Sequence, residues 1–129
     1  MKPKAITTDR APKAVAAYSQ AVHSNGFIFC SGQIPLDPAT GAVVEGDASV
    51  QAKRVMDNLA GVLEAAGSDF EHVARATIYL VDMNDFARVN DVYAGYFKGE
   101  TKPARVTIAV AALPRAAKVE IEMIAVPKG

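Results

Sequence analysis

The clearest pattern along the chain is a stripe of apolar positions that recur at steps of three and four residues. This spacing places their side chains on one side of an α-helix. Asp47 or Ser49 can cap the start of the helix, and Gly67 suits the left-handed residue that follows a helix end. The pattern predicts an amphipathic helix whose buried side carries Ala52, Val55, Met56, Leu59, Val62, Leu63 and Ala66.

A second helix is predicted over residues 84–97, because large apolar side chains again share one side. They are Phe86, Val89, Tyr93, Tyr96 and Phe97. Asn90 follows Phe86 by about one helical turn and falls within the same stripe. A buried amide without a hydrogen-bonding partner costs roughly 1–3 kcal/mol. We therefore expect Asn90 to point inward and to have a partner.

Other segments have the composition and alternation of strands. Residues 18–22 and 27–31 flank the pair Asn25-Gly26, which favours a type I′ turn, so they should form a hairpin. Two prolines in residues 34–41 block a central strand there and indicate an ordered loop. Residues 73–81 alternate at period two, and the drier face of this strand carries Ala74, Ala76, Ile78 and Leu80.

The chain is expected to end in a second hairpin. Pro103 stops the preceding helix, and residues 105–110 alternate once more. A turn over residues 113–116 then leads into a strand over residues 119–126. If these two strands are neighbours and their faces agree, Glu120 lies near Thr107.

The order strands, helix, strand, helix, strands indicates an α+β layer structure with both helices on one face of a sheet. The final strands are apolar on both sides. A sheet covered on one face only would then expose an apolar surface unless subunits associate, so we expect an oligomer. With no internal repeat and no long linker, residues 1–129 are expected to form one domain.

Composition mainly excludes classes of protein. The chain has 129 residues, 14 basic and 14 acidic side chains, 50% hydrophobic residues and one cysteine. Proteins that bind nucleic acids usually carry clusters of lysine and arginine, whereas this chain has zero net charge. Nucleic-acid binding is therefore not expected. A lone thiol and the lack of a secretion signal lead us to expect a cytoplasmic protein. No apolar run reaches the roughly 18 residues of a membrane span.

Familiar catalytic motifs are missing. His23 and His72 are isolated, and neither HExxH nor CxxC occurs, so no metal site is expected. No glycine-rich phosphate-binding motif occurs, and Ser31 does not lie in a G-x-S-x-G motif. Cys30 is interpreted as a small core residue on a strand, because buried thiols in apolar surroundings are unreactive.

The sequence leaves the roles of two charged residues, Arg105 and Glu120, open. Arg105 begins a strand directly after Pro103-Ala104, which stiffens its backbone. It is either a strand-end arginine in water or a fixed guanidinium fork, whose parallel donors match a carboxylate. Glu120 on the last strand is either a solvated glutamate or a carboxylate that holds water beside a bound anion.

Several groups of residues form a further pattern in chain order. They are Tyr18-Ser19-Gln20-Ala21-Val22, Cys30-Ser31-Gly32-Gln33-Ile34-Pro35-Leu36-Asp37-Pro38, Asn58-Leu59 with Leu63-Glu64-Ala65-Ala66-Gly67, Asp85-Phe86 with Val89-Asn90-Asp91-Val92-Tyr93, Pro103-Ala104-Arg105, and Leu113-Pro114 with Val119-Glu120-Ile121-Glu122. The pattern covers nearly the whole chain. It resembles the Rid family of reactive-intermediate deaminases, also known as translation inhibitors or perchloric-acid-soluble proteins.

The resemblance implies a chorismate-mutase-like α+β fold, with a six-stranded mixed sheet and two helices on one face. It implies a homotrimer whose sheets line a central barrel and whose active sites lie between subunits. The implied reaction is hydrolysis of 2-iminobutanoate, 2-iminopropanoate and their enamine tautomers to 2-keto acids and ammonia. Pyridoxal-phosphate enzymes such as threonine and serine dehydratases release these imines, and the deaminase itself needs no cofactor.

The resemblance also implies roles for individual residues. Arg105 would bind the substrate carboxylate, and Glu120 would orient and activate the attacking water. The other expected site residues supply hydroxyls near the imine nitrogen and the carboxylate (Tyr18 and Ser31), a backbone N–H for the carboxylate (Thr107), support from the second helix (Asn90) and a further substrate contact (Gly32).

This chain departs from the family pattern at two places. Ala16-Ala17 stands where the family usually has Gly-Pro, and Thr107 stands where many deaminases have cysteine. One alternative is therefore a non-catalytic pocket on the same scaffold that binds a small carboxylate or 2-keto acid. Another is an RNA-cleaving translation inhibitor, against which the zero net charge weighs.

Overall fold

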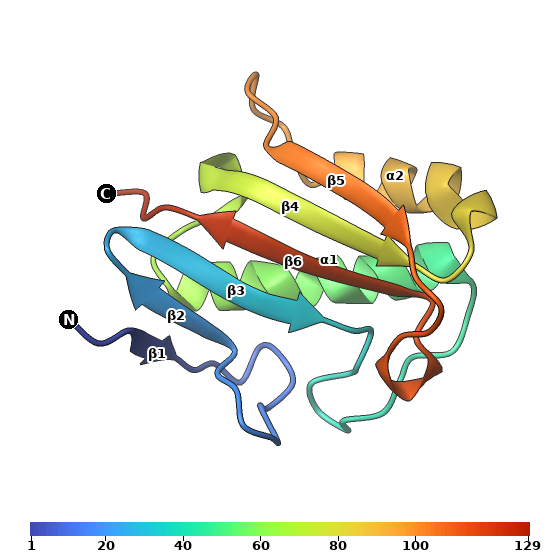
Figure 1. Ribbon diagram of the computed structural model, residues 1–129, viewed down its shortest axis with the longest axis horizontal. Coiled ribbons are helices and arrows are strands. Elements are labelled where there is room, and N and C mark those ends of the chain that lie inside the picture. The colour runs from blue at the N-terminus through green and yellow to red at the C-terminus, as the bar shows by residue number, and fades with distance from the viewer.

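The computed structural model describes residues 1–129, and both helices lie on the same side of one sheet (Figure 1). The strands are β1 (Lys4–Ile6), β2 (Ala21–Ser24), β3 (Phe27–Gln33), β4 (Val73–Leu80), β5 (Ala104–Ala109) and β6 (Val119–Ala125), and the helices are α1 (Ala48–Ala65) and α2 (Phe86–Ala94). The six strands follow the order β1-β2-β3-β6-β4-β5, with β4 and β5 parallel and the other neighbours antiparallel. The predicted α+β class with a mixed sheet is confirmed.

Helix α1 forms where the apolar stripe predicts it. The Asp47 carboxylate accepts hydrogen bonds from the backbone N–H groups of Ser49 and Val50 at 3.0 and 3.1 Å, which caps the first turn. Gly67 follows the helix with a φ of 77°, which glycine adopts without strain. The stripe is buried in one core with residues of the sheet, among them Ile28, Ile78 and Ile121.

Helix α2 is shorter than predicted. A single 3₁₀ turn, Met83–Asp85, precedes it, and the Asp82 carboxylate caps this turn by accepting the backbone N–H of Asn84 at 2.9 Å. The helix ends at Ala94, directly before Gly95, which is a poor helix former. The apolar spacing continues past this end because Phe97 still packs into the core.

The first hairpin has the predicted turn. Asn25 and Gly26 have positive φ values of 50° and 80°, and Ser24 pairs with Phe27 across them. Strand β2 begins at Ala21, so residues 18–20 lie in the preceding loop rather than in the strand as predicted.

The predicted second hairpin is wrong. Strand β5 pairs only with β4, in parallel, whereas β6 lies between β3 and β4. Parallel strands need a crossover, and the segment containing α2 supplies it between β4 and β5. The central place suits β6, because it buries four alternating apolar side chains: Val119, Ile121, Met123 and Ala125.

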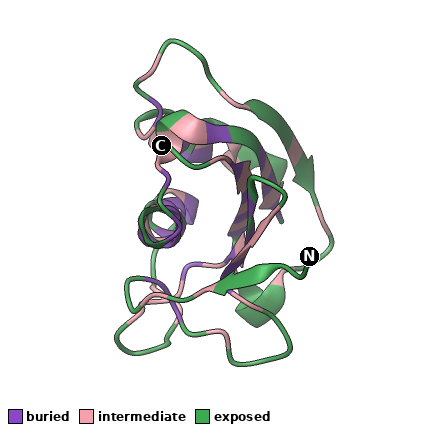
Figure 2. Cartoon of the chain, turned by 90° about the vertical axis from the view of Figure 1, so that its left-hand side faces the viewer, coloured by how far each residue is buried: buried purple, intermediate pink, exposed green.

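The two faces of the sheet differ in their cover. Ala76, Ile78 and Leu80 are fully buried on the helix side, as predicted, but a bulge between Val73 and Arg75 reverses the alternation before them, so that Val73 is buried and Ala74 is exposed. Figure 2 shows the sheet from its edge, with helical cover on one side only. The open face exposes Phe29, Val106 and Ile108, so the sheet has the uncovered apolar surface that the sequence predicts.

Neither helix combines the length and the apolar character that crossing a membrane requires.

Candidate active site

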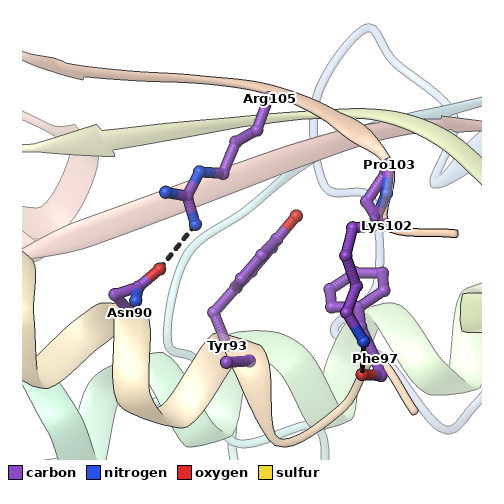
Figure 3. Close-up of a pocket in the computed structure, with 7 residues that line it drawn as sticks. Asn90, Tyr93, Phe97, Lys102, Pro103 and Arg105 are labelled. Carbon is purple, nitrogen blue, oxygen red and sulfur yellow. Dashed lines mark hydrogen bonds between the residues drawn. The ribbon is translucent and has the colours of Figure 1, made fainter. Parts of the chain in front are cut away.

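Arg105 is held in place by contacts on the helix side of the sheet. Its Nη1 donates a hydrogen bond to Asn90 Oδ1 at 2.6 Å, from β5 to α2 (Figure 3). Its guanidinium carbon lies 5.5 Å from the ring centroid of Phe86 and 5.1 Å from that of Tyr93. No carboxylate lies within ion-pair distance of this guanidinium. The arrangement is that of a fixed fork with donors left over for an external anion.

Asn90 has the partner that its place in the helical stripe requires. The side chain is half-buried, and its carbonyl oxygen accepts the bond from Arg105. The sequence predicted an inward amide without indicating its partner. The pairing arises because β5 forms the edge of the sheet beside β4, on the side where α2 lies (Figure 1).

A cavity of about 420 Å³ opens beside Arg105, between α2 and the start of β5. The hydroxyl of Tyr93, which lines the cavity, is buried without a hydrogen-bonding partner, and burial raises its pKa. The hydroxyl of Thr107, two residues after Arg105 on β5, is also buried without a partner. Figure 3 shows the Tyr93 hydroxyl directed toward β5. Phe86 and Tyr93 were not predicted as partners of Arg105, although they flank Asn90 on the same helical stripe. The cavity is lined by Asn90, Tyr93, Ala94, Phe97, Lys102, Pro103 and Arg105.

Glu120 lies on the open face of the sheet and is half-buried. Burial raises the pKa of its carboxyl, and the nearby negative charge of Glu122 raises it further. No hydrogen bond within the chain engages this carboxylate, unlike that of Glu122, to which Tyr79 donates. A half-buried carboxylate with a raised pKa and free oxygen atoms is suited to accept a proton.

The expected proximity of Glu120 to Thr107 is wrong. Arg105 and Thr107 pair with Ala76 and Ile78, whose side chains point to the helices. Glu120 pairs with Tyr79, whose side chain points to the open face. Within one chain, Arg105 and Glu120 therefore lie on opposite faces of the sheet.

Gly32 lies beside Glu120, and Ser31 directly precedes it, at an irregularity of β3 between Cys30 and Gln33. The Ser31 hydroxyl donates to the backbone carbonyl of Ser19 at 2.6 Å. A methyl group at Gly32 would overlap Oε2 of Glu120, so the carboxylate occupies space that is free only because residue 32 has no side chain.

Tyr18 directly precedes Ser19 and is exposed, with 51% of its surface accessible. Cys30 is buried, and burial raises the pKa of its thiol to about 12, which agrees with its interpretation as a core residue.

The predicted site residues thus form two groups. Arg105, Asn90 and Thr107 make the first, which we call the arginine group. Glu120, Ser31 and Gly32, with Tyr18 in the adjoining loop, make the second, which we call the glutamate group. Nowhere in the chain do three His, Cys, Asp or Glu side chains gather as potential metal ligands.

The family described as endoribonuclease L-PSP matches residues 8–127, a range that includes both groups. The chain superposes on the conserved Rid-family protein YyfA of Yersinia pestis with a TM-score of 0.94 and 45% identity, over 97% of this chain and 99% of that one. This chain belongs to the Rid family. Among its Rid relatives, protein DfrA of Myxococcus xanthus is 59% identical over 98% of this chain and 97% of its own. The 2-iminobutanoate/2-iminopropanoate deaminase of mouse is 50% identical over 95% of this chain and 90% of its own.

Proposed function

We propose that this Rid protein is an imine deaminase that hydrolyses 2-iminobutanoate, 2-iminopropanoate and their enamine tautomers to 2-keto acids and ammonia. The observation that carries the proposal is the Arg105 fork, which Asn90 and two aromatic rings hold in place without a carboxylate partner. The activity named for the mouse relative supports the choice of substrate. These imines would come from pyridoxal-phosphate dehydratases.

In the proposed mechanism, the N–H donors of the Arg105 guanidinium that Asn90 leaves free bind the carboxylate of the imino acid, and the backbone N–H of Thr107 assists. This fixes C2 of the imine next to a water that Glu120 orients. Glu120 accepts a proton as the water oxygen bonds to C2, and the C=N π electrons pass to nitrogen. Glu120 returns this proton to nitrogen, helped by the Tyr18 and Ser31 hydroxyls, which gives an amino group and a hydroxyl on C2. The remaining hydroxyl proton then passes to the amino group by way of Glu120, the O–H electron pair forms the keto group, and the C–N electron pair leaves with nitrogen as ammonia.

A second copy of the chain would complete the site. Arg105 and Glu120 lie on opposite faces of the sheet, so one chain cannot direct both at one small substrate. We propose a trimer in which the open sheet faces line a central barrel and each site combines the arginine group of one subunit with the glutamate group of the next. Burial of the exposed Phe29, Val106 and Ile108 would favour such association.

The activity is testable with an enzyme that makes the imine. Threonine dehydratase acting on threonine in the presence of semicarbazide yields a trapped adduct of the imine. Added deaminase should lower the amount of adduct and raise the amount of free 2-ketobutyrate correspondingly. An unchanged amount of adduct would refute the proposal, and tight binding of 2-ketobutyrate without turnover would instead favour a carboxylate-binding protein.

Replacing Gly32 with alanine should separate activity from stability. The new methyl group would displace the Glu120 carboxylate, which is the mobile end of a side chain, while the backbone stays in place. Misplacing a catalytic group by about 1 Å lowers activity by roughly 10- to 100-fold. We therefore expect a loss of this size in the trapping assay with little change in melting temperature. The matched control is Gly99→Ala, where the nearest atom would be an ordinary 3.6 Å away; an active Gly32→Ala would contradict this placement of Glu120.

A further inference from the structure

The hollow around Glu120 contains a second carboxylate and a tyrosine that the proposed mechanism does not use. Its lining comes from β3, β4, β6 and the loop before β6: Gly32, Tyr79, Val110, Ala112, Leu113, Pro114, Glu120 and Glu122. Glu120 and Glu122 are two residues apart on one strand, so their side chains share the open face. The hollow therefore contains two carboxylates and no cationic side chain.

Tyr79 distinguishes between these two carboxylates. Its Cα is the cross-strand partner of Glu120 in the register of β4 and β6, yet its hydroxyl donates a hydrogen bond to the carboxylate of Glu122. Glu122 thus has a fixed donor, and Glu120 has none within the chain. Two neighbouring carboxylates in different surroundings are the usual way in which a protein divides the roles of charge and proton carrier.

We propose that Glu122, held by Tyr79, is a positioning residue that leaves Glu120 as the one free carboxylate of the pair and sets the pH range in which Glu120 takes up a proton. This inference rests on the proposed function. In the proposed reaction Glu120 touches the water, while Glu122 acts only through its charge and through its bond to Tyr79.

Charges on the surrounding elements support this assignment. The negative charge of Glu122 disfavours ionisation of Glu120, and both carboxylates, with the hydrogen bond to Glu122, raise the pKa of Tyr79. β4 also presents Arg75 on the open face, where it lines a neighbouring hollow together with Tyr79 and Glu122 but not Glu120, and it makes no ion pair with either glutamate. β3 presents Gly32, and the loop presents Val110 to Pro114 without a charged lining residue. Glu122 is therefore the charge that governs Glu120.

The test is the pH profile of kcat/KM for Glu122→Gln. Glutamine retains an oxygen that accepts the Tyr79 hydroxyl but carries no charge. Removing the charge lowers the pKa of Glu120, so the acid limb of the profile should move to lower pH. Tyr79→Phe should move it to higher pH, because the hydroxyl no longer offsets the charge of Glu122. Glu45→Gln, which removes an exposed charge far along the chain, should leave the limb unmoved.

A Glu122→Gln profile that superimposes on the wild-type profile would overturn the inference, and an unmoved Tyr79→Phe profile would remove Tyr79 from it. A wild-type protein without deaminase activity would refute the proposed function instead. The inference then remains testable by ¹³C NMR titration of the Glu120 carboxyl, which needs no substrate. The midpoint of that titration should fall in Glu122→Gln, and an unchanged midpoint would refute the inference by itself.

Discussion

Replacing Arg105 with alanine should lower the deaminase kcat/KM by about 10²- to 10⁴-fold, because a bidentate carboxylate contact contains two hydrogen bonds to a charged group at roughly 1.5–3 kcal/mol each. The fold should survive. Arg105 is exposed and makes one side-chain hydrogen bond, to Asn90, together with two aromatic contacts. The imine-trapping assay gives the rate, and the melting temperature and sedimentation of the variant show whether the assembly is intact.

Two further variants test the geometry of the fork. Arg105→Lys keeps the charge but loses the parallel donors, so it should recover only a small part of the activity. Asn90→Asp places a carboxylate where an amide now lies 2.6 Å from Arg105, so it should compete with the substrate and raise KM. Arg88→Ala is the matched control, because this exposed arginine of the same helix already lies near Asp47 and Asp85. Wild-type rates for Arg105→Ala would remove Arg105 from the mechanism.

Glu120→Gln should lower kcat by about 10²- to 10⁴-fold, the usual effect of removing a general base. The stability of the Glu120→Gln protein, unlike its activity, should not fall. The pKa of Glu120 is raised in the fold, so the ionised carboxylate destabilises the native protein fully above the folded pKa, and this destabilisation fades as the pH falls from the folded to the unfolded pKa. The variant should therefore melt at the same or a higher temperature than wild type at neutral pH, and the difference should vanish in acid.

Mixing two inactive proteins tests whether the site is shared between subunits. After subunit exchange in an equal mixture of Arg105→Ala and Glu120→Gln, about a quarter of the sites would combine an intact arginine group with an intact glutamate group. Activity should therefore return to about a quarter of the wild-type value. A mixture of Glu120→Gln with Gly32→Ala, both altered in the glutamate group, should regain nothing. Failure of the first mixture to recover, with exchange confirmed by native mass spectrometry, would refute a site that combines Arg105 and Glu120 from two subunits.

The predictions that were confirmed depend on neighbours in the sequence. The periodic stripe and the Asp47 cap define α1, and Asn25-Gly26 defines the first hairpin, because each of these interactions spans only a few residues. Strand β1 has only three residues, too few for alternation to be recognised. The end of α2 was misplaced because the apolar spacing runs on into the turn after Ala94.

The same distinction applies to the candidate site. Arg105, Asn90 and Glu120 were identified from the residues and from the Rid resemblance, and the structure pairs Arg105 with Asn90 and places Glu120 in a hollow of the open face. The sequence did not predict that these residues divide into an arginine group and a glutamate group on opposite faces of the sheet. The contact of Asn90 with Arg105 and that of Tyr79 with Glu122 each join segments more than 10 residues apart. These contacts depend on the order and register of the strands, which local sequence patterns do not define.

The amino-acid sequence by itself determined the helices, the first hairpin, the family pattern and the residues with free charge, because these follow from local periodicity and from side-chain chemistry. Only the tertiary structure decided that β6 enters the middle of the sheet and that Arg105 and Glu120 face opposite sides of it. The physical reason is that strand pairing is a choice among distant partners, made by burial of the whole sheet. A shift of one residue in register would reverse the face on which every side chain of a strand lies.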